Sequence, residues 1–112
     1  MLEVKDKGRV LQIISHCTRI EDIVSNISKE EFYNDLGIRE MVCFNIFQIG
    51  ELAKGLSDDF IMENNKQPWK QIKGMRDIIG HGYGTINFEI VWNTAKNSVQ
   101  ELRKYLEVIL KN

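Results

Sequence analysis

One short stretch of the chain gathers side chains whose types and spacing could do chemistry. Residues 74–84 read GMRDIIGHGYG, which places Arg76, His81 and Tyr83 among four of the eight glycines. Arginine binds phosphate through a planar guanidinium and stays charged at every relevant pH. Histidine gives and takes a proton near neutrality. Together, Arg76 and His81 are what phosphodiester chemistry could use.

Basic residues lead up to this stretch at helical spacing. Lys66, Lys70, Lys73 and Arg76 recur at steps of four, three and three, so on a helix they form a basic line that points toward His81. Lys70 and Lys73 could contact RNA phosphates, or the line could be only a solvated helix face. Lys73 could also simply pair with an aspartate four residues later in the chain.

On a single straight helix, the side chains of Arg76 and His81 would point in different directions and could not both contact one small chemical group. Side chains five residues apart lie about 140° from each other around a helix axis, whereas Tyr83 would share a face with Arg76. Two arrangements resolve this difficulty. Gly80 and Gly82 could end the helix and let His81 swing, or a second subunit could supply its own pair across a shared cleft.

The first half of the chain predicts helices and no strand of useful length. Apolar residues recur at steps of three and four over residues 5–27 and again over residues 38–56. Ser28 and Glu31 match a capping box, which predicts the start of a short helix between those two segments. Gly37 is where we expect a break before the second long helix.

The second half of the chain predicts two further helices. Pro68 suits the first turn of the helix that carries Arg76, because its missing N–H does no harm there. Asn87 can cap a last helix that runs through Ile109. The sequence has no internal repeat, linker or low-complexity segment. We therefore expect one all-α domain, residues 1–112, built as an up-and-down bundle of four to five helices.

The helix over residues 38–56 is apolar on more than one side. Phe44 and Phe47 lie away from the side that carries Val42 and Ile49, and Gly50 falls in the middle. A mid-helix glycine is destabilising by about 1 kcal/mol relative to alanine, which close backbone approach would repay. Either neighbours in the same bundle cover this extra side, or a second copy of the chain packs near Phe44, Phe47 and Gly50.

Polar residues are interspersed on the same helix. Asn45, Gln48 and Glu51 recur at steps of three. They could be solvated surface positions, or they could line a groove or cleft.

Composition and charge exclude several classes of protein. The net charge is −1, so no overall basic field favours nucleic acid and any anion site must be local. Cys17 and Cys43 have no paired spacing, which favours buried thiols in a reducing compartment. No stretch approaches the roughly 18 apolar residues of a membrane span, and the N-terminus lacks a signal-peptide pattern. We expect a soluble, cytoplasmic protein with no membrane association.

The histidines do not suggest a metal centre. His81 has no second histidine or suitably spaced acidic cluster beside it, so metal ligation is not expected. His16 lies beside the apolar stripe of the first helix and is most simply a boundary residue. No cofactor is expected.

The motif resembles a known signature. RDIIGHGY, residues 76–83, reads Arg-x4-His-x-Tyr and resembles the signature of HepT-like toxins in the HEPN superfamily. IFQIGELAKGLS, residues 46–57, is similar to the central helix of that family. PWKQIKGMRDIIGHGYGTINFEIVWNTA, residues 68–95, is similar to its motif-bearing segment. The resemblance covers the C-terminal two thirds, although Gly80 is smaller than the residue expected directly before the histidine.

The resemblance implies a homodimeric HEPN-type helical bundle in which two motifs meet in a cleft. Family members act as metal-independent ribonuclease toxins, and attack by the neighbouring 2′-hydroxyl would leave a 2′,3′-cyclic phosphate. The implied antitoxin is a cognate minimal nucleotidyltransferase, which silences its partner by transferring AMP to the motif tyrosine. The alternative is a non-catalytic HEPN module that binds a nucleotide or a partner.

The resemblance also implies a role for each motif residue in this chain. Arg76 would bind the scissile phosphate of the RNA, and Asp77 would orient Arg76. His81 would act as the general base or acid, and Tyr83 would accept AMP.

Overall fold

The chain folds entirely into helices and turns within its described part. The computed structural model describes residues 2–81 and 83–111, and the side chains at positions 78, 81 and 83 lie outside that description. The elements in chain order are α1 (Val4–Val24), α2 (Lys29–Asn34), α3 (Leu36–Lys54), α4 (Asp58–Glu63), α5 (Trp69–His81), η1 (Tyr83–Thr85), α6 (Phe88–Asn93), η2 (Thr94–Ser98) and α7 (Val99–Lys111). The predicted all-α class is confirmed.

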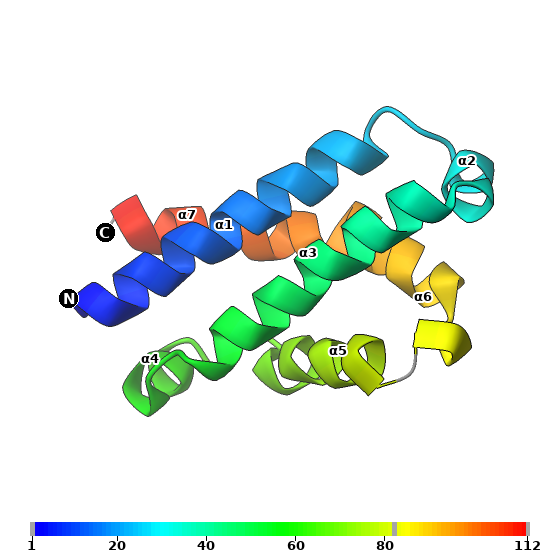
Figure 1. The fold of residues 1–112 in the computed structure, drawn as a ribbon. Helices are drawn as coiled ribbons and strands as arrows, with labels where there is room; N and C mark the ends of the chain where they lie inside the picture. The colour runs from blue at the N-terminus through cyan, green and yellow to red at the C-terminus, as the bar shows by residue number, and fades with distance from the viewer. Residues whose placement is uncertain (1, 82, 112) are drawn as a thin grey trace.

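Helix α3 occupies the middle of the bundle. It runs beside α1 on one side and packs along α5 on the other, while α7 lies against α1 (Figure 1). The buried apolar residues of α1 face this core at helical spacing, with Val10, Ile13, Cys17 and Ile20 fully buried. Burial of these stripes is the main force that holds the helices together.

Local capping signals set the starts of α2 and α3. At α2, the Glu31 N–H donates to Ser28 Oγ and the Ser28 N–H donates to the Glu31 carboxylate, each over 3.1 Å, so the predicted capping box is confirmed. The predicted break at Gly37 is wrong. Asp35 Oδ1 accepts from the Ile38 N–H at 3.0 Å, and Gly37 lies inside the first turn of α3. The side-chain acceptor, rather than the glycine, determines where the helix begins.

Helix α4 is a short element that the apolar pattern did not predict. Ser57 caps it, because Ser57 Oγ accepts from the Phe60 N–H at 3.1 Å. The carboxylate of Asp6, 3% exposed, accepts from the Ser57 N–H at 2.9 Å and from the Ser57 hydroxyl at 2.6 Å. These bonds satisfy a buried carboxylate and tie the start of α1 to the start of α4.

The last helical segment contains an irregular turn. Asn87 caps α6 as predicted, since its Oδ1 accepts from the backbone N–H groups of Glu89 at 3.0 Å and Ile90 at 3.3 Å. Elements α6, η2 and α7 follow one another without a loop, and η2 is a π-helical turn. Such a turn accommodates one residue more than a regular helix would.

The backbones of α3 and α5 approach each other closely at Gly50. A Cβ added there would lie 2.5 Å from Arg76 Cβ and 3.2 Å from the Ile72 carbonyl oxygen. A neighbour in the same bundle therefore covers this part of the extra side of α3. The cover is partial, because Phe47 is half-buried and Phe44 is 57% exposed.

Substitution by alanine should have opposite effects at two glycines of this helix pair, Gly50 and Gly74. Gly50→Ala should lower the free energy of unfolding by about 1–3 kcal/mol, because the new methyl group meets the α5 backbone. Gly74→Ala is the matched control, since a Cβ at Gly74 meets nothing within 4 Å. It should raise stability by up to about 1 kcal/mol through helix propensity. Urea unfolding followed by circular dichroism measures both, and a stabilised Gly50→Ala chain would contradict the close approach.

Candidate active site

The guanidinium of Arg76 is held at the junction of α3 and α5. Its Nε donates to the carboxylate of Glu51 on α3, and its Nη1 donates to Asp77 Oδ1 at 2.9 Å. The guanidinium carbon lies 5.5 Å from the centre of the Phe47 ring. Hydrogen bonds to Asp77 first and to Glu51 second raise the pKa of Arg76, so this group stays a cation.

This arrangement leaves Arg76 able to bind an anion. The two carboxylate contacts use two of the five N–H donors that a guanidinium carries. The Arg76 side chain is 27% exposed, so its other donors can reach a ligand from solvent. An oriented cation with free donors suits a phosphate group, which takes two parallel hydrogen bonds from arginine.

Helix α5 continues through His81, the second residue of the motif. Gly80 lies inside the helix and does not end it, whereas Gly82 lies outside the described residues, so both arrangements stay open as predictions. On a regular helix, residues five apart lie about 140° from each other around the axis. Tyr83 begins η1 after the helix. The side chains of His81 and Tyr83 lie outside the part of the chain that the structure describes.

The three polar residues predicted to line a cleft, Asn45, Gln48 and Glu51, lie in different environments. Asn45 is buried, with 7% of its surface exposed, and its Oδ1 lies 2.8 Å from His16 Nδ1 on α1. Gln48 lines a hollow between α1 and α3. Glu51 is the member of the set that joins the Arg76 cluster, where its side chain is 40% exposed.

The remaining predicted contacts lie along α5. Lys70 is exposed and Lys73 is half-exposed, while Asp77 contacts Arg76 directly. The contact of the Arg76 guanidinium with the Phe47 ring was not predicted from the sequence. The signal was present, because Phe47 and Glu51 are four residues apart and so share one face of α3.

The cysteines take no part in this cluster. Cys17 and Cys43 are free and buried, as predicted. Burial raises the pKa of Cys17 to about 12 and that of Cys43 to about 11, so both thiols are poor nucleophiles.

Two further findings concern the described residues as a whole. Among the described side chains, which do not include that of His81, no three of His, Cys, Asp or Glu gather as a metal site would require. No helix in the described part of the chain is long and apolar enough to cross a bilayer.

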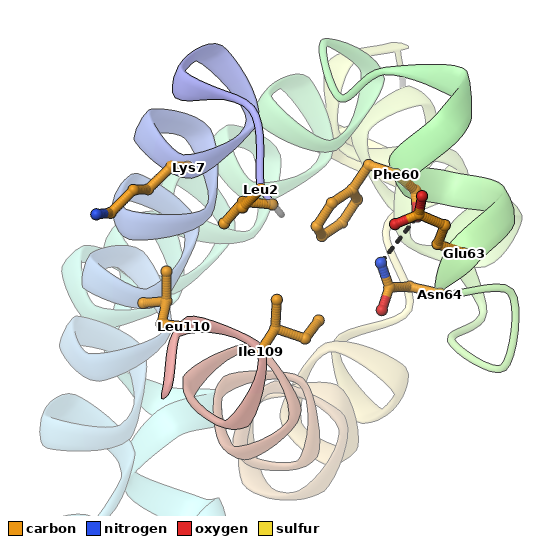
Figure 2. Close-up of a pocket in the computed structure, with 7 residues that line it drawn as sticks. All are labelled: Leu2, Lys7, Phe60, Glu63, Asn64, Ile109 and Leu110. Carbon is orange, nitrogen blue, oxygen red and sulfur yellow. Dashed lines mark hydrogen bonds between the residues drawn. The ribbon is translucent and has the colours of Figure 1, made fainter. Parts of the chain in front are cut away.

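A separate hollow of about 420 Å³ lies where the first residues, α4 and the end of α7 meet (Figure 2). Its lining comprises Leu2, Lys7, Phe60, Glu63, Asn64, Ile109 and Leu110. Asn64 Nδ2 donates to the Phe60 carbonyl at 2.9 Å across one wall. The hollow contains none of the predicted site residues.

Comparison with known proteins identifies the family. Residues 13–109 match the family model described as ribonuclease HepT-like. The chain belongs to this family. It is 34% identical over 99 residues to a protein named "Putative RNase" from Caldanaerobacter subterraneus subsp. tengcongensis, covering 88% of each chain. A protein named "Probable ribonuclease HepT" from Thermococcus cleftensis is 28% identical, covering 87% of this chain and 97% of its own.

A third relative bears the same name as the first, and no solved structure is similar enough to count as a match. A protein also named "Putative RNase", from Methanocaldococcus jannaschii, is 33% identical over 100 residues, covering 89% of this chain and 83% of its own. No solved structure matches the chain significantly.

The Arg76 cluster predicts a local response to loss of Glu51. Glu51→Gln removes the charge that holds Arg76 Nε, so the Arg76 Hε proton should exchange with water faster in NMR spectra. The unfolding midpoint should move little, because a solvent-exposed ion pair contributes little to stability. Glu40→Gln is the matched control on the exposed side of α3 and should leave the Arg76 signal unchanged. An unchanged Hε exchange rate in Glu51→Gln would show that Glu51 does not hold Arg76.

Proposed function

We propose that this chain is a metal-independent ribonuclease that cleaves RNA with Arg76 and His81. One observation carries the proposal: Arg76 is held by Glu51 and Asp77 on the helix that ends at His81. The names of the relatives support the same activity. Lys70 and Lys73, on the same helix, would contact flanking RNA phosphates.

The cleavage follows from the chemistry of these two side chains. The 2′-hydroxyl of the RNA attacks the adjacent phosphorus, and His81 of one subunit takes its proton. Arg76 binds the phosphate oxygens and stabilises the charge that grows on them. The bond to the leaving 5′-oxygen breaks, and that oxygen takes a proton from the imidazolium of a second His81 or from water. The products are a 2′,3′-cyclic phosphate and a 5′-hydroxyl end.

The active form in this proposal is a homodimer. Regular helical spacing would place Arg76 and His81 about 140° apart, so a second copy would bring its own histidine toward the same phosphate. The exposed side of α3 offers a contact surface, since Phe44 is 57% exposed and Met41 is 49% exposed. Large apolar side chains exposed together favour association. Sedimentation at micromolar concentration should give a dimer, and a stable monomer would contradict this part of the proposal.

The proposed cellular role is that of a toxin in a toxin–antitoxin pair. The antitoxin would be a cognate minimal nucleotidyltransferase, acting in the cytoplasm, that transfers AMP to the Tyr83 hydroxyl. Each transfer adds one phosphodiester charge and a bulky adenosine beside Arg76. The attached phosphate would pair with Arg76 and the adenosine would block RNA.

One observation favours a second candidate function. Two carboxylates already hold Arg76, as they would if the residue only joined α3 to α5. The chain would then be a non-catalytic HEPN module that binds a nucleotide or a partner protein. The two candidates differ in whether the isolated chain cuts RNA.

Substitution of the motif residues should slow cleavage strongly, and cleavage by the wild-type chain should not need a metal ion. His81→Ala should slow cleavage by a factor on the order of 10²–10⁴, because it removes the general acid–base. Arg76→Lys should also be impaired, since it keeps the charge but loses the planar fork. Cleavage of a labelled RNA should persist in excess EDTA and leave a 2′,3′-cyclic phosphate, which mass spectrometry identifies. Activity lost in EDTA and restored by Mg²⁺ would refute the mechanism, and a wild-type chain that cuts no RNA beyond the His81→Ala background would favour the non-catalytic module.

Tyr83 predicts a covalent modification. Intact mass of the chain co-expressed with its cognate nucleotidyltransferase should show added AMP, and Tyr83→Phe should show none. The variant should keep much of its ribonuclease activity, because the proposed mechanism does not use the Tyr83 hydroxyl. Tyr33→Phe and Tyr105→Phe are the matched controls and should still be modified. AMP mapped to either of those tyrosines would rule out the assignment.

A further inference from the structure

A second polar hollow, of about 320 Å³, lies on the α1 side of α3, whereas Arg76 lies on the α5 side. It is lined by Gln12, Ser15, His16, Arg19, Gln48 and Leu52. The lining has one guanidinium, one imidazole, two amides and a hydroxyl, and it has no carboxylate. A hollow with cationic and neutral donors and no acid favours an anion over a cation.

The buried amide of Asn45 orients His16 at the floor of this hollow. Asn45 Nδ2 donates to the Met41 carbonyl at 2.8 Å, so Asn45 Oδ1 is the atom that faces His16 Nδ1, also at 2.8 Å. An amide oxygen only accepts hydrogen bonds, so Nδ1 carries a proton. The other ring nitrogen, Nε2, lies on the far side of the imidazole and is left for a ligand.

Arg19 contributes a cation that no acid in the described part of the chain neutralises. Its Nη1 lies 3.5 Å from His16 Nδ1, but that nitrogen carries a proton, so the contact is not a hydrogen bond. The described ion pairs include two carboxylate contacts each for Arg76 and Arg103 and none for Arg19. Arg19 thus keeps its donors for a molecule from outside.

We propose that this hollow binds a phosphate group of a nucleotide or of RNA. The guanidinium of Arg19 would take two phosphate oxygens. Gln12 and Gln48 would donate to the same oxygens or, in a terminal phosphate, to the third one, and His16 Nε2 would accept from a ribose hydroxyl. Binding of RNA here rests on the proposed ribonuclease function, whereas binding of a free nucleotide does not.

Direct binding tests the hollow with three probes: inorganic phosphate, AMP and a 2′-O-methyl decauridylate, which lacks the attacking hydroxyl. The chain has two histidines, so His16→Gln assigns the imidazole signals of His16 in NMR spectra. At least one probe should shift those signals in a saturable way. If none does, the hollow is not a phosphate site, and the His16–Asn45 pair only joins α1 to α3.

Matched variants separate a specific contact from general charge. Arg19→Gln should weaken binding of the probe about tenfold, and for the oligonucleotide it should reduce the slope of log affinity against log salt by about 0.7. Arg9→Gln is the control, because it removes the same charge from the same helix outside the hollow. Equal losses in both variants would overturn the proposal.

A second pair of variants adds a negative charge inside or outside the hollow. Gln48→Glu places a carboxylate in the lining and should weaken phosphate binding, whereas Gln100→Glu on α7 adds the same charge elsewhere. No difference between these two would also overturn the proposal.

The outcomes distinguish the two proposals from each other. A chain that binds AMP in the hollow but neither binds nor cuts RNA supports the hollow and defeats the ribonuclease. A chain that cuts RNA through His81, with all three probes bound equally by wild type and Arg19→Gln, supports the ribonuclease and defeats the hollow.

Discussion

The close approach of α3 and α5 at Gly50 determines the geometry of the candidate site. Because Gly50 has no side chain, Arg76 Cβ sits directly against the α3 backbone. From there its guanidinium reaches Phe47 and Glu51, which lie on either side of Gly50 along α3. A bulkier residue would separate the two helices and move the cation away from both contacts. One absent methyl group thus sets the position of the residue proposed to bind phosphate.

The carboxylates around Arg76 orient its guanidinium and still leave it accessible to a ligand. Glu51 and Asp77 direct the guanidinium, but both carboxylates are largely exposed, with 40% and 59% of their side chains accessible. Water screens such pairs, so a phosphate can replace one carboxylate at little net loss. Phe47 stays in place when an ion pair opens, because its contact with Arg76 does not depend on those carboxylates. The cluster therefore combines a permanent apolar support with exchangeable ionic partners.

Local signals in the sequence predicted much of the fold. The partners of Asp6, Arg76 and Asn45 could not be predicted, because they lie far away along the chain. Ser28 and Asn87 cap helices through neighbours within three residues, so their roles follow from the sequence alone. Helix α4 also has a local cap, from Ser57 to Phe60, but its six residues are too few to show an apolar repeat. The bond that ties its start to α1 joins Ser57 to Asp6, which is 51 residues away. The motif at Arg76 was readable as a pattern, but its partner Glu51 lies 25 residues upstream on another helix. Burial of Asn45 likewise required knowledge of its position opposite His16.

The π-helical turn Thr94–Ser98 has a consequence for how this helix can vary among relatives. The turn holds one extra residue between α6, whose Trp92 packs on Phe32 at 5.2 Å between ring centres, and α7, whose Leu106 is fully buried. Removal of that residue would rotate α7 by about 100° relative to α6. The apolar stripe of α7 would then point away from α1. An insertion or deletion in this segment therefore changes which side of α7 faces α1. A relative that lacks the extra residue needs its apolar residues at different positions along α7.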